Sequence, residues 1–560
     1  MTLLISTNIP KLFKKLALIV LFFVCQSHFG QELMLKIISE NATEMTTIDS
    51  IGYQKKHVNV KSIMEEVQKF SDQLLQMGYL ENELLDSKKL SDTLFQFHFR
   101  LRTPTKYVHM YLEKDAEILG FEKDSIIIPI RETTDFLKKK LSELELKGFS
   151  LASLRLADFR KADGKLFALL KIETNKKRLL SEIVINGYEK FPLGHKRNLK
   201  RLYNQKIFNK NNLDKIYKDF NNFRFVSQTR YPEILFSEDS TKVYVYLEKA
   251  KANRFDGYIG FANQEDGKVD FTGYLDLALV NILNAGEAFN LYWKGDDNEQ
   301  VTFNTSLEVP YIFKSPLGVK ANLNIFKQDS TFQNTKTAID LGYYFTYNKK
   351  LFIGYQSTES SDIQNTNNSM ISDFESSFLT STFEYRNFID DALFSEKTRF
   401  IFKSGIGERA SKLENNTQSF FELNFSHNLH LNKRNIINLK SQNFYLNSEH
   451  FITNELYRFG GIQSVRGFNE NSLQANILTS LLTEYRYILS SGLYVHSVLD
   501  YGFYEDATTN TTNNLLGIGF GFGIRSKNGL LNLIYANGST KNQAIELSNS
   551  VVQIKFVTEF

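Results

Sequence analysis

Cysteine is almost absent from this chain of 560 residues, and neither sign of charge is in large excess. The single cysteine, Cys25, ends an apolar run near the N-terminus. A chain cleaved beyond that run would have no disulfide, no metal-thiolate site and no thiol nucleophile. The formal net charge is only +4, and no stretch resembles a nucleic-acid-binding module. The composition therefore predicts no nucleic-acid partner.

Long apolar runs are also missing. Past residue 30, no segment approaches the roughly 20 apolar residues that a membrane helix needs. Aromatic residues nevertheless make up 14% of the chain, with 48 Phe and 27 Tyr. Such a content suits an outer surface that faces lipid through girdles of aromatic side chains. If the chain spans a membrane, we expect it to do so with strands.

Enzyme signatures are lacking as well. The nine histidines form no HExxH motif, and neither GxSxG nor a phosphate-binding glycine loop occurs. The acidic residues are scattered, without a reason to converge on one site. Asp296, Asp297 and Glu299 could bind a surface cation, although a solvated loop is the preferred interpretation. We expect no enzymatic activity, no cofactor and no metal site.

The N-terminus has the pattern of a secretory signal peptide. Lys11, Lys14 and Lys15 precede an apolar run that ends at Cys25, and small and polar residues follow. Cleavage near residue 30 is the preferred prediction. Lipidation of Cys25 is an alternative, which the bulky Val24 disfavours, because a lipobox needs a small residue there.

The rest of the chain has two halves. Up to about residue 250, charged helical stretches alternate with short strands. The last unit of this half predicts the order β-α-α-β-β, with strand 181–188, helices 193–204 and 209–223, and strands 225–236 and 242–250. Helices at 60–78 and 133–148, each followed by strand patterns, repeat this theme twice upstream. Generic α+β domains are the alternative interpretation of these units.

From residue 254 onward almost every segment alternates apolar and polar residues, as transmembrane strands do. Sixteen segments are predicted, with starts near 254, 268, 285, 299, 317, 333, 349, 376, 397, 418, 434, 476, 492, 514, 529 and 550. An even number allows closure, which satisfies every backbone hydrogen bond. If the first strand rises from the soluble half, the long connections 357–373 and 446–475 both lie on the outer side.

One strand, 515–525, has glycines at every second position. Gly517, Gly519, Gly521 and Gly523 are predicted to face the lumen, while the intervening apolar residues face lipid. An inner wall without side chains leaves space for another part of the chain to lie against it.

The long connection before residue 476 contains the most specific motif. It reads Arg-Phe-Gly-Gly-Ile-Gln-Ser-Val-Arg-Gly-Phe, with the loop glycines Gly460 and Gly461 followed by Val465, Arg466, Gly467 and Phe468. This motif resembles the sixth-loop signature of the superfamily of outer-membrane protein assembly and translocation factors that contains BamA, TamA and the two-partner-secretion transporters. The β-α-α-β-β units resemble its POTRA domains, and the terminal Phe560 resembles the C-terminal signal of outer-membrane barrels.

The resemblance covers nearly the whole chain and implies its organisation. It predicts a membrane β-barrel of about 16 antiparallel strands at 253–560. A signal peptide at 1–30 and POTRA-like α+β domains at 31–104, 105–178 and 179–252 precede it. In this superfamily the loop arginine folds back onto an acidic residue of the inner wall. Here Arg466 would meet Asp500, with Glu484 as second choice, although both carboxylates could simply be solvated.

The resemblance also implies a function. Such a protein lies in the outer membrane of a Gram-negative bacterium, with its N-terminal domains in the periplasm. It would bind unfolded outer-membrane or secreted client proteins through its POTRA domains and insert or translocate them, by lateral opening of the barrel. Outer-membrane lipid and accessory periplasmic or lipoprotein subunits are further expected partners. A dedicated exporter of one partner protein is the alternative, and a porin or lipid-handling barrel is a third possibility.

Overall fold

The computed structural model describes residues 32–560, apart from 163–164, 264–268, 297–298, 366, 368–369, 413, 528, 542 and 547–549. The predicted signal peptide, Cys25 and Asp297 lie outside the described residues. No helix among the described residues is long and apolar enough to cross a membrane. The chain forms two compact units, 1–177 and 178–560.

The first domain is a four-stranded mixed sheet covered by two helices. Its elements are β1 (Leu33–Ile38), α2 (Ala42–Ile51), β2 (Lys56–His57), α3 (Val60–Gln76), β3 (Glu83–Lys89) and β4 (Leu94–Arg100), with sheet order β2-β1-β4-β3. Helix α3 forms here because its apolar residues recur at helical spacing, and Ile63, Val67, Phe70 and Leu74 are all buried. The side chain of Asn59 caps it by accepting from the backbone N–H of Ser62.

The second domain departs from the predicted theme. Its elements are β5 (Tyr107–Leu112), the 3-10 helix η1 (Lys114–Leu119), β6 (Ser125–Pro129), α4 (Ile130–Leu146), β7 (Ser153–Ala162) and β8 (Lys165–Glu173), with sheet order β6-β5-β8-β7. A short 3-10 helix and an added strand therefore stand where the third unit has its first helix. Gly120, with φ +76°, ends η1 after six residues.

The third domain has the predicted order without additions. Its elements are β9 (Glu182–Asn186), α5 (Leu193–Tyr203), α6 (Lys210–Asn221), β10 (Val226–Phe236) and β11 (Thr241–Lys249), with sheet order β10-β11-β9. Apolar residues of α6 pack against the alternate residues of β11, so that Ile216, Phe220, Val243 and Val245 are buried in one core. Both outer strands of this small sheet, β9 and β10, have a free edge within the described chain.

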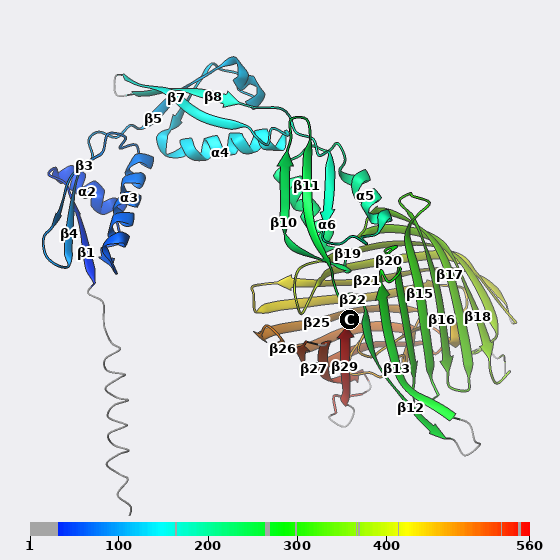
Figure 1. The fold of residues 1–560 in the computed structure, drawn as a ribbon. Coiled ribbons are helices and arrows are strands. Elements are labelled where there is room, and N and C mark those ends of the chain that lie inside the picture. Colours follow the sequence, from blue (N-terminus) through cyan, green and yellow to red (C-terminus); the bar gives the residue numbers. More distant parts are fainter. Residues whose placement is uncertain are drawn as a thin grey trace, which may run out of the picture. The chain divides into compact units, whose positions relative to one another are not determined.

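The remaining residues form a closed antiparallel barrel of sixteen strands, which confirms the predicted fold class (Figure 1). The strand starts lie close to those predicted from alternation. The strands are β12 (Arg254–Asn263), β13 (Val269–Val280), β14 (Ala288–Gly295), β15 (Val301–Ile312), β16 (Leu317–Gln328), β17 (Phe332–Thr346), β18 (Lys349–Asp362), β19 (Phe374–Phe388), β20 (Glu396–Ser411), β21 (Asn415–His430), β22 (Asn435–Asn447), β25 (Ile477–Ser490), β26 (Leu493–Asp506), β27 (Thr511–Ser526), β28 (Gly529–Thr540) and β29 (Ser550–Glu559).

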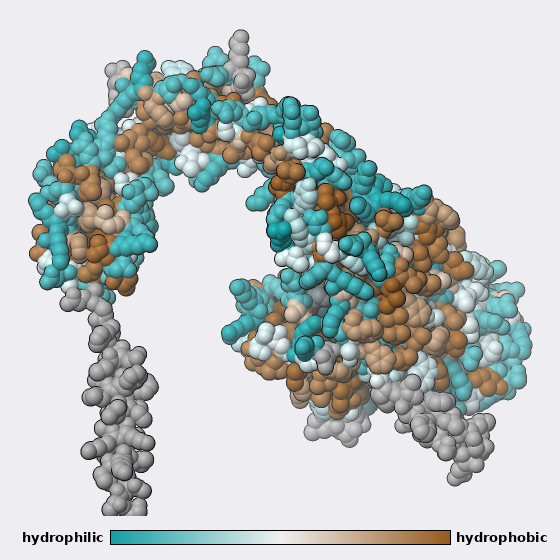
Figure 2. Space-filling view, viewed as in Figure 1, coloured by the Kyte–Doolittle hydropathy of each residue, from teal (hydrophilic) through white to brown (hydrophobic). Residues whose placement is uncertain are grey.

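Burial follows the alternation along each strand. On β26, Leu499 and Tyr501 are each 53% exposed on the outer wall. The alternate residues Val498 and Asp500 are buried on the inner wall. Figure 2 shows hydrophobic side chains gathered over the outside of the barrel strands. This apolar outer surface is the one expected of a wall that faces lipid.

The third domain docks on the barrel through His195 of α5. This imidazole is fully buried among Phe223, Phe225, Tyr311 and Tyr347, and neither ring nitrogen has a hydrogen-bond partner in the described chain. Burial lowers the pKa of His195 to about 3, so the ring is neutral at physiological pH. Beside it, the Asn198 amide donates to the Tyr311 hydroxyl at 2.9 Å.

Gly286, in the turn before β14, makes this docking possible. Its φ is +81°, and a Cβ there would lie 1.9 Å from Cε1 of His195. We expect Gly286→Ala to destabilise the docked domain by about 2–4 kcal/mol, from left-handed backbone strain and overpacking. Limited proteolysis of the purified protein would then cut the third domain faster. Adding His195→Ala should restore part of the protection, and unchanged cleavage of the single variant would contradict the prediction.

Candidate functional site

The sixth outer loop, between β22 and β25, folds back into the barrel. It contains the short helix η2 (Thr453–Glu455) and a hairpin of β23 (Tyr457–Phe459) and β24 (Leu473–Ala475). Gly460 and Gly461 follow β23 with φ of +107° and +91°. A Cβ on Gly460 would lie 2.5 Å from the carbonyl oxygen of Asn469. The two glycines thus allow the loop to turn where a side chain would be strained.

The loop brings its own apolar residues into the lumen. Val465 is fully buried, and Phe459 is nearly so, in one cluster with Leu478, Leu482 and Leu515 of the barrel wall. Phe468 packs against the same cluster. Phe459, Val465 and Phe468 therefore fasten the loop to the barrel wall, and Arg466, which lies between Val465 and Phe468 in the sequence, is held against that wall.

Arg466 binds both carboxylates that the sequence singled out. Its Nε donates to Oδ2 of Asp500 at 2.8 Å and its Nη2 donates to Oδ1 at 2.5 Å, a bidentate pair. Its backbone N–H donates to the same carboxylate at 2.9 Å, and its Nη1 donates to Glu484. Arg466 is 2% exposed and Asp500 is 0% exposed. The two acidic residues that the sequence ranked as alternatives thus act together.

A second arginine completes the network. Arg486 donates from Nε to Oε2 of Glu484 at 2.7 Å and from Nη1 to Asn428 at 2.9 Å. Its guanidinium also lies 4.3 Å from the ring centroid of Phe394. Glu484 therefore bridges two guanidinium groups, and each buried charge has an opposite partner. Sequence reasoning missed this role of Arg486, for which its position two residues after Glu484, on the same face of β25, was the available signal.

The predicted glycine wall receives the loop at one position. A Cβ on Gly517 would lie 2.3 Å from the carbonyl oxygen of Arg466. On the neighbouring strand, Gly538 touches Gly467, since a Cβ on either would come within 2.5 Å of the other's backbone. The loop backbone thus rests directly on β27 and β28.

At the other three glycines, the atoms nearest to an added Cβ belong to the barrel wall and not to the loop. Gly521 and Gly523 leave room for the side chains of His496 and Tyr494 on β26, and Gly519 adjoins Ala536 on β28. The space that the sequence predicted is filled there by neighbouring wall residues. Gly538 was missed because a lone glycine in a strand has no periodicity to mark it.

Polar contacts anchor the loop to distant strands as well. Glu470 pairs with Lys294 of β14 at 2.6 Å and accepts from the Tyr292 hydroxyl at 2.9 Å. Glu455 accepts from Arg409 of β20 at 2.6 Å. The partners of Glu470 come from β14, far from the loop in the strand order, and Arg409 comes from β20, two strands before β22. No local pattern in the sequence could have linked these residues to the loop.

The seam between the first and last strands is the second feature of the site. β12 and β29 share only two residue pairs, Arg254 with Glu559 and Phe255 with Thr558. By contrast, β29 pairs with β28 along its length, from Gly529 with Thr558 to Asn537 with Ser550. The backbone N–H of Phe560 donates to the carbonyl of Asn253 at 3.0 Å, and the Phe560 side chain is half exposed. Among the described residues, most of the facing edges of β12 and β29 thus have no cross-strand partner, although Lys555 of β29 pairs with Asp276 of β13 at 3.0 Å.

The comparisons with known proteins concern the fold. No family model matches the sequence, and no curated protein matches it. Among solved structures, the chain is similar to CdiB from Acinetobacter baumannii (TM-score 0.50, 14% identity, 89% of this chain and 97% of that chain covered). It is similar to CdiB from Escherichia coli to the same degree (TM-score 0.50, 12% identity, 89% and 98% covered).

A structure of BamA from Haemophilus ducreyi lacking POTRA domains 1–3 is also similar (TM-score 0.45, 14% identity, 80% of this chain and 98% of that chain covered). At such identities a likeness concerns the fold alone. The likeness to the two CdiB structures confirms the fold that the sixth-loop motif predicted, a sixteen-stranded barrel preceded by POTRA-like domains.

Proposed function

We propose that this protein inserts other β-barrel proteins into the outer membrane. The observation that carries the proposal is the seam, where only two residue pairs join β12 and β29. An unpaired strand edge is a template for another strand. When the seam opens, a client strand can therefore add to β12 or β29 by the backbone hydrogen bonding that normally closes a sheet.

The N-terminal domains would supply the clients. The edge strands β9 and β10 can each accept an extended peptide. Beside β9, a groove against α5 is lined by Ile183, Ile185 and Leu199, with Lys196 and Lys200 also among its lining residues. In this proposal these domains lie in the periplasm, and lipid surrounds the barrel. Accessory subunits remain expected partners, and the chain carries out no enzymatic step.

Quantitative proteomics of outer membranes after depletion of the protein tests the proposal. Loss of many barrel proteins is the expected result. Retention of all of them would overturn it. Complementation with the wild-type gene should restore the profile, which controls for indirect effects of depletion.

Export of one dedicated partner is the second candidate function. It is favoured by a cavity of about 590 Å³ in the lumen, whose described lining residues include none from the sixth loop. Loss of only one or two surface proteins in the same experiment would support it over general insertion.

A further inference from the structure

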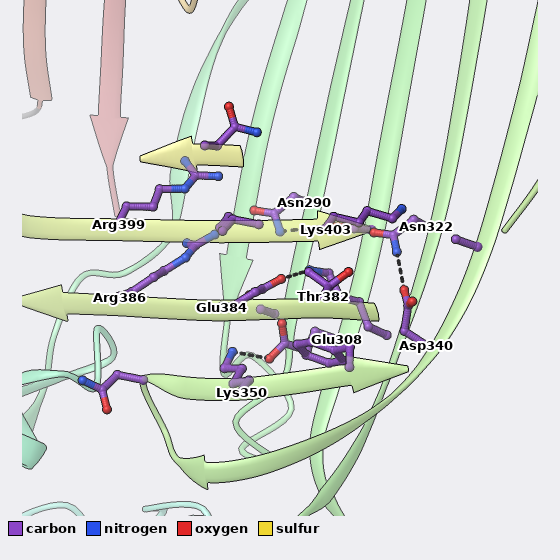
Figure 3. A pocket seen from close by; sticks show the side chains of 18 of the residues that line it. Asn290, Glu308, Asn322, Asp340, Lys350, Thr382, Glu384, Arg386, Arg399 and Lys403 are labelled. Carbon is purple, nitrogen blue, oxygen red and sulfur yellow. Dashed lines mark hydrogen bonds and ion pairs between the residues drawn. The ribbon is translucent and has the colours of Figure 1, made fainter. Parts of the chain in front are cut away.

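The lumen cavity is lined by side chains of strands β14 to β21 and by Arg224 and Arg254 (Figure 3). A second cavity of about 520 Å³ continues it toward the sixth loop. The two cavities share Asn324, Lys336, Gln356, Lys403 and Glu422 as lining residues. A passage lined by both polar and apolar side chains thus runs from the end near the third domain toward the outer loops.

Basic side chains outnumber acidic ones in the first cavity, eight to four. Two of the basic residues are neutralised, since Lys350 pairs with Glu308 and Lys320 pairs with Glu384, each at 2.5 Å. Figure 3 shows both of these acidic residues pointing into the cavity with their contacts drawn. The excess positive charge therefore comes from the remaining residues.

Arginines without an anionic hydrogen-bond partner gather at the end of the cavity near the third domain. Arg386 of β19 and Arg399 of β20 are direct cross-strand partners, an arrangement in which like charges repel. Nε of Arg386 lies 4.0 Å from Oε1 of Glu396. The described residues give Arg399 no hydrogen bond or ion pair, although the charges of Glu396 and Glu384 act on it.

Two more arginines join them. Arg224 follows α6, two residues after Asn222. The side chain of Asn222 accepts from the backbone N–H of Phe388 on β19, and this contact holds the end of α6 at the barrel. Arg254 begins β12, and its Nε is buried without a partner among the described residues. Burial lowers the pKa of Arg224, and the positive charges of Arg254 and Arg386 lower it further. Four guanidinium groups therefore share one region, where Glu396 and Glu384 supply negative charge but, among the described residues, accept no hydrogen bond from any of the four.

The chemistry of this region defines its ligand. Guanidinium groups bind carboxylates and phosphates through bidentate hydrogen bonds. Lys336 and Lys403 continue the positive charge into the shared part of the passage, which suits a ligand with several anionic groups in a row. Apolar lining side chains such as Phe352 and Ile401 alternate with the polar ones on this inner wall, so an extended acidic polypeptide with mixed side chains fits it better than an anionic lipid of the surrounding bilayer.

We propose that the mouth of the lumen is a binding site for a carboxylate-rich, extended segment of a client polypeptide. The contact residues are Arg224, Arg254, Arg386 and Arg399, followed by Lys336 and Lys403. That the ligand belongs to a client rests on the proposed function, whereas the anion site rests on the cavity itself.

Fluorescence anisotropy with the purified full-length protein in detergent tests the site. The probe is a fluorescein-labelled peptide of alternating Glu and Ser, compared with the matching Lys and Ser peptide. The wild-type protein should bind the acidic peptide only. The double variant Arg386→Gln with Arg399→Gln should bind it about tenfold or more weakly, because it loses charge-assisted hydrogen bonds to the peptide carboxylates. Arg386→Lys with Arg399→Lys should lose less, because the charge remains.

A matched control removes two exposed charges of α4 outside the barrel, Arg131→Gln with Lys139→Gln, and should bind like wild type. Equal affinity of the wild type and the Arg386/Arg399 glutamine variant would overturn the proposal, as would equal binding of the two peptides. Displacement of the peptide by vesicles containing an anionic phospholipid, but not by excess unlabelled peptide, would assign the site to lipid instead. None of these outcomes depends on the depletion experiment, so the two proposals can fail separately.

Discussion

Arg466→Ala is expected to release the sixth outer loop from the barrel wall and to abolish activity. The substitution leaves Asp500, which is 0% exposed, without the guanidinium that neutralises it, and it removes one of the two guanidinium groups that Glu484 binds, so that only Arg486 remains. Removing one partner of a buried ion pair costs about 3–5 kcal/mol. Burying the Val465 side chain contributes roughly 1.5–3 kcal/mol. The packing of Val465 alone is therefore too weak to hold the loop in place. The loop backbone would then leave Gly517 and Gly538.

Protease cleavage within the loop, in intact cells and in the purified protein, measures this release. Arg434→Ala, which removes an exposed arginine from the turn between β21 and β22, is the matched control and should leave the loop protected. Arg466→Lys should behave nearly like alanine, because an ammonium group cannot form the bidentate pair with Asp500 while also reaching Glu484. A protected loop in the alanine variant would contradict the prediction.

The second large effect is expected from a covalent bond across the seam. Phe255→Cys with Thr558→Cys places cysteines at paired positions of β12 and β29. Antiparallel partners have Cα atoms about 4.5–5.5 Å apart, within the range that a disulfide spans. Because client insertion in our proposal requires the seam to open, the oxidised variant should lose activity and a reductant should restore it. Recovery of client barrels in the outer membrane measures both states.

The control disulfide joins strands that are already fully paired. Leu533 and Ile554 are partners on β28 and β29, so Leu533→Cys with Ile554→Cys should form a bond without affecting activity. If the seam disulfide forms and activity persists, lateral opening is not part of the mechanism. If both disulfides abolish activity, the loss is due to oxidation and not to closure of the seam.

Prediction from the sequence succeeded where a short-range pattern of residues is compatible with one structure only. Strand alternation located the sixteen strands, because a wall between lipid and lumen imposes a period of two on every strand. The β-α-α-β-β order was correct for the third domain. It failed in the second domain, where the segment before Gly120 is too short to complete an α-helix and forms the 3-10 helix η1.

Prediction failed where partners come together from distant strands. The glycines of β27 have the expected spacing, but only Gly517 adjoins the loop. The other three adjoin residues of the neighbouring strands, because the loop crosses β27 at a single position. The contacts of Glu470 and Glu455, and the pairing of Arg386 with Arg399, join residues of separate hairpins. Such contacts depend on the register of the strands around the barrel, and the local periodicity of the sequence does not predict that register.

By itself, the sequence determined the strand number, the inner and outer faces and the loop motif, since these depend on the spacing of residues along the chain. Only the tertiary structure decided that Arg466 takes both Asp500 and Glu484, that the seam is held by two residue pairs, and that four arginines meet at one end of the lumen. The reason is closure of the barrel. Closing sixteen strands brings residues hundreds of positions apart into contact, and the relative shift of neighbouring strands, which spacing does not encode, selects which charges meet.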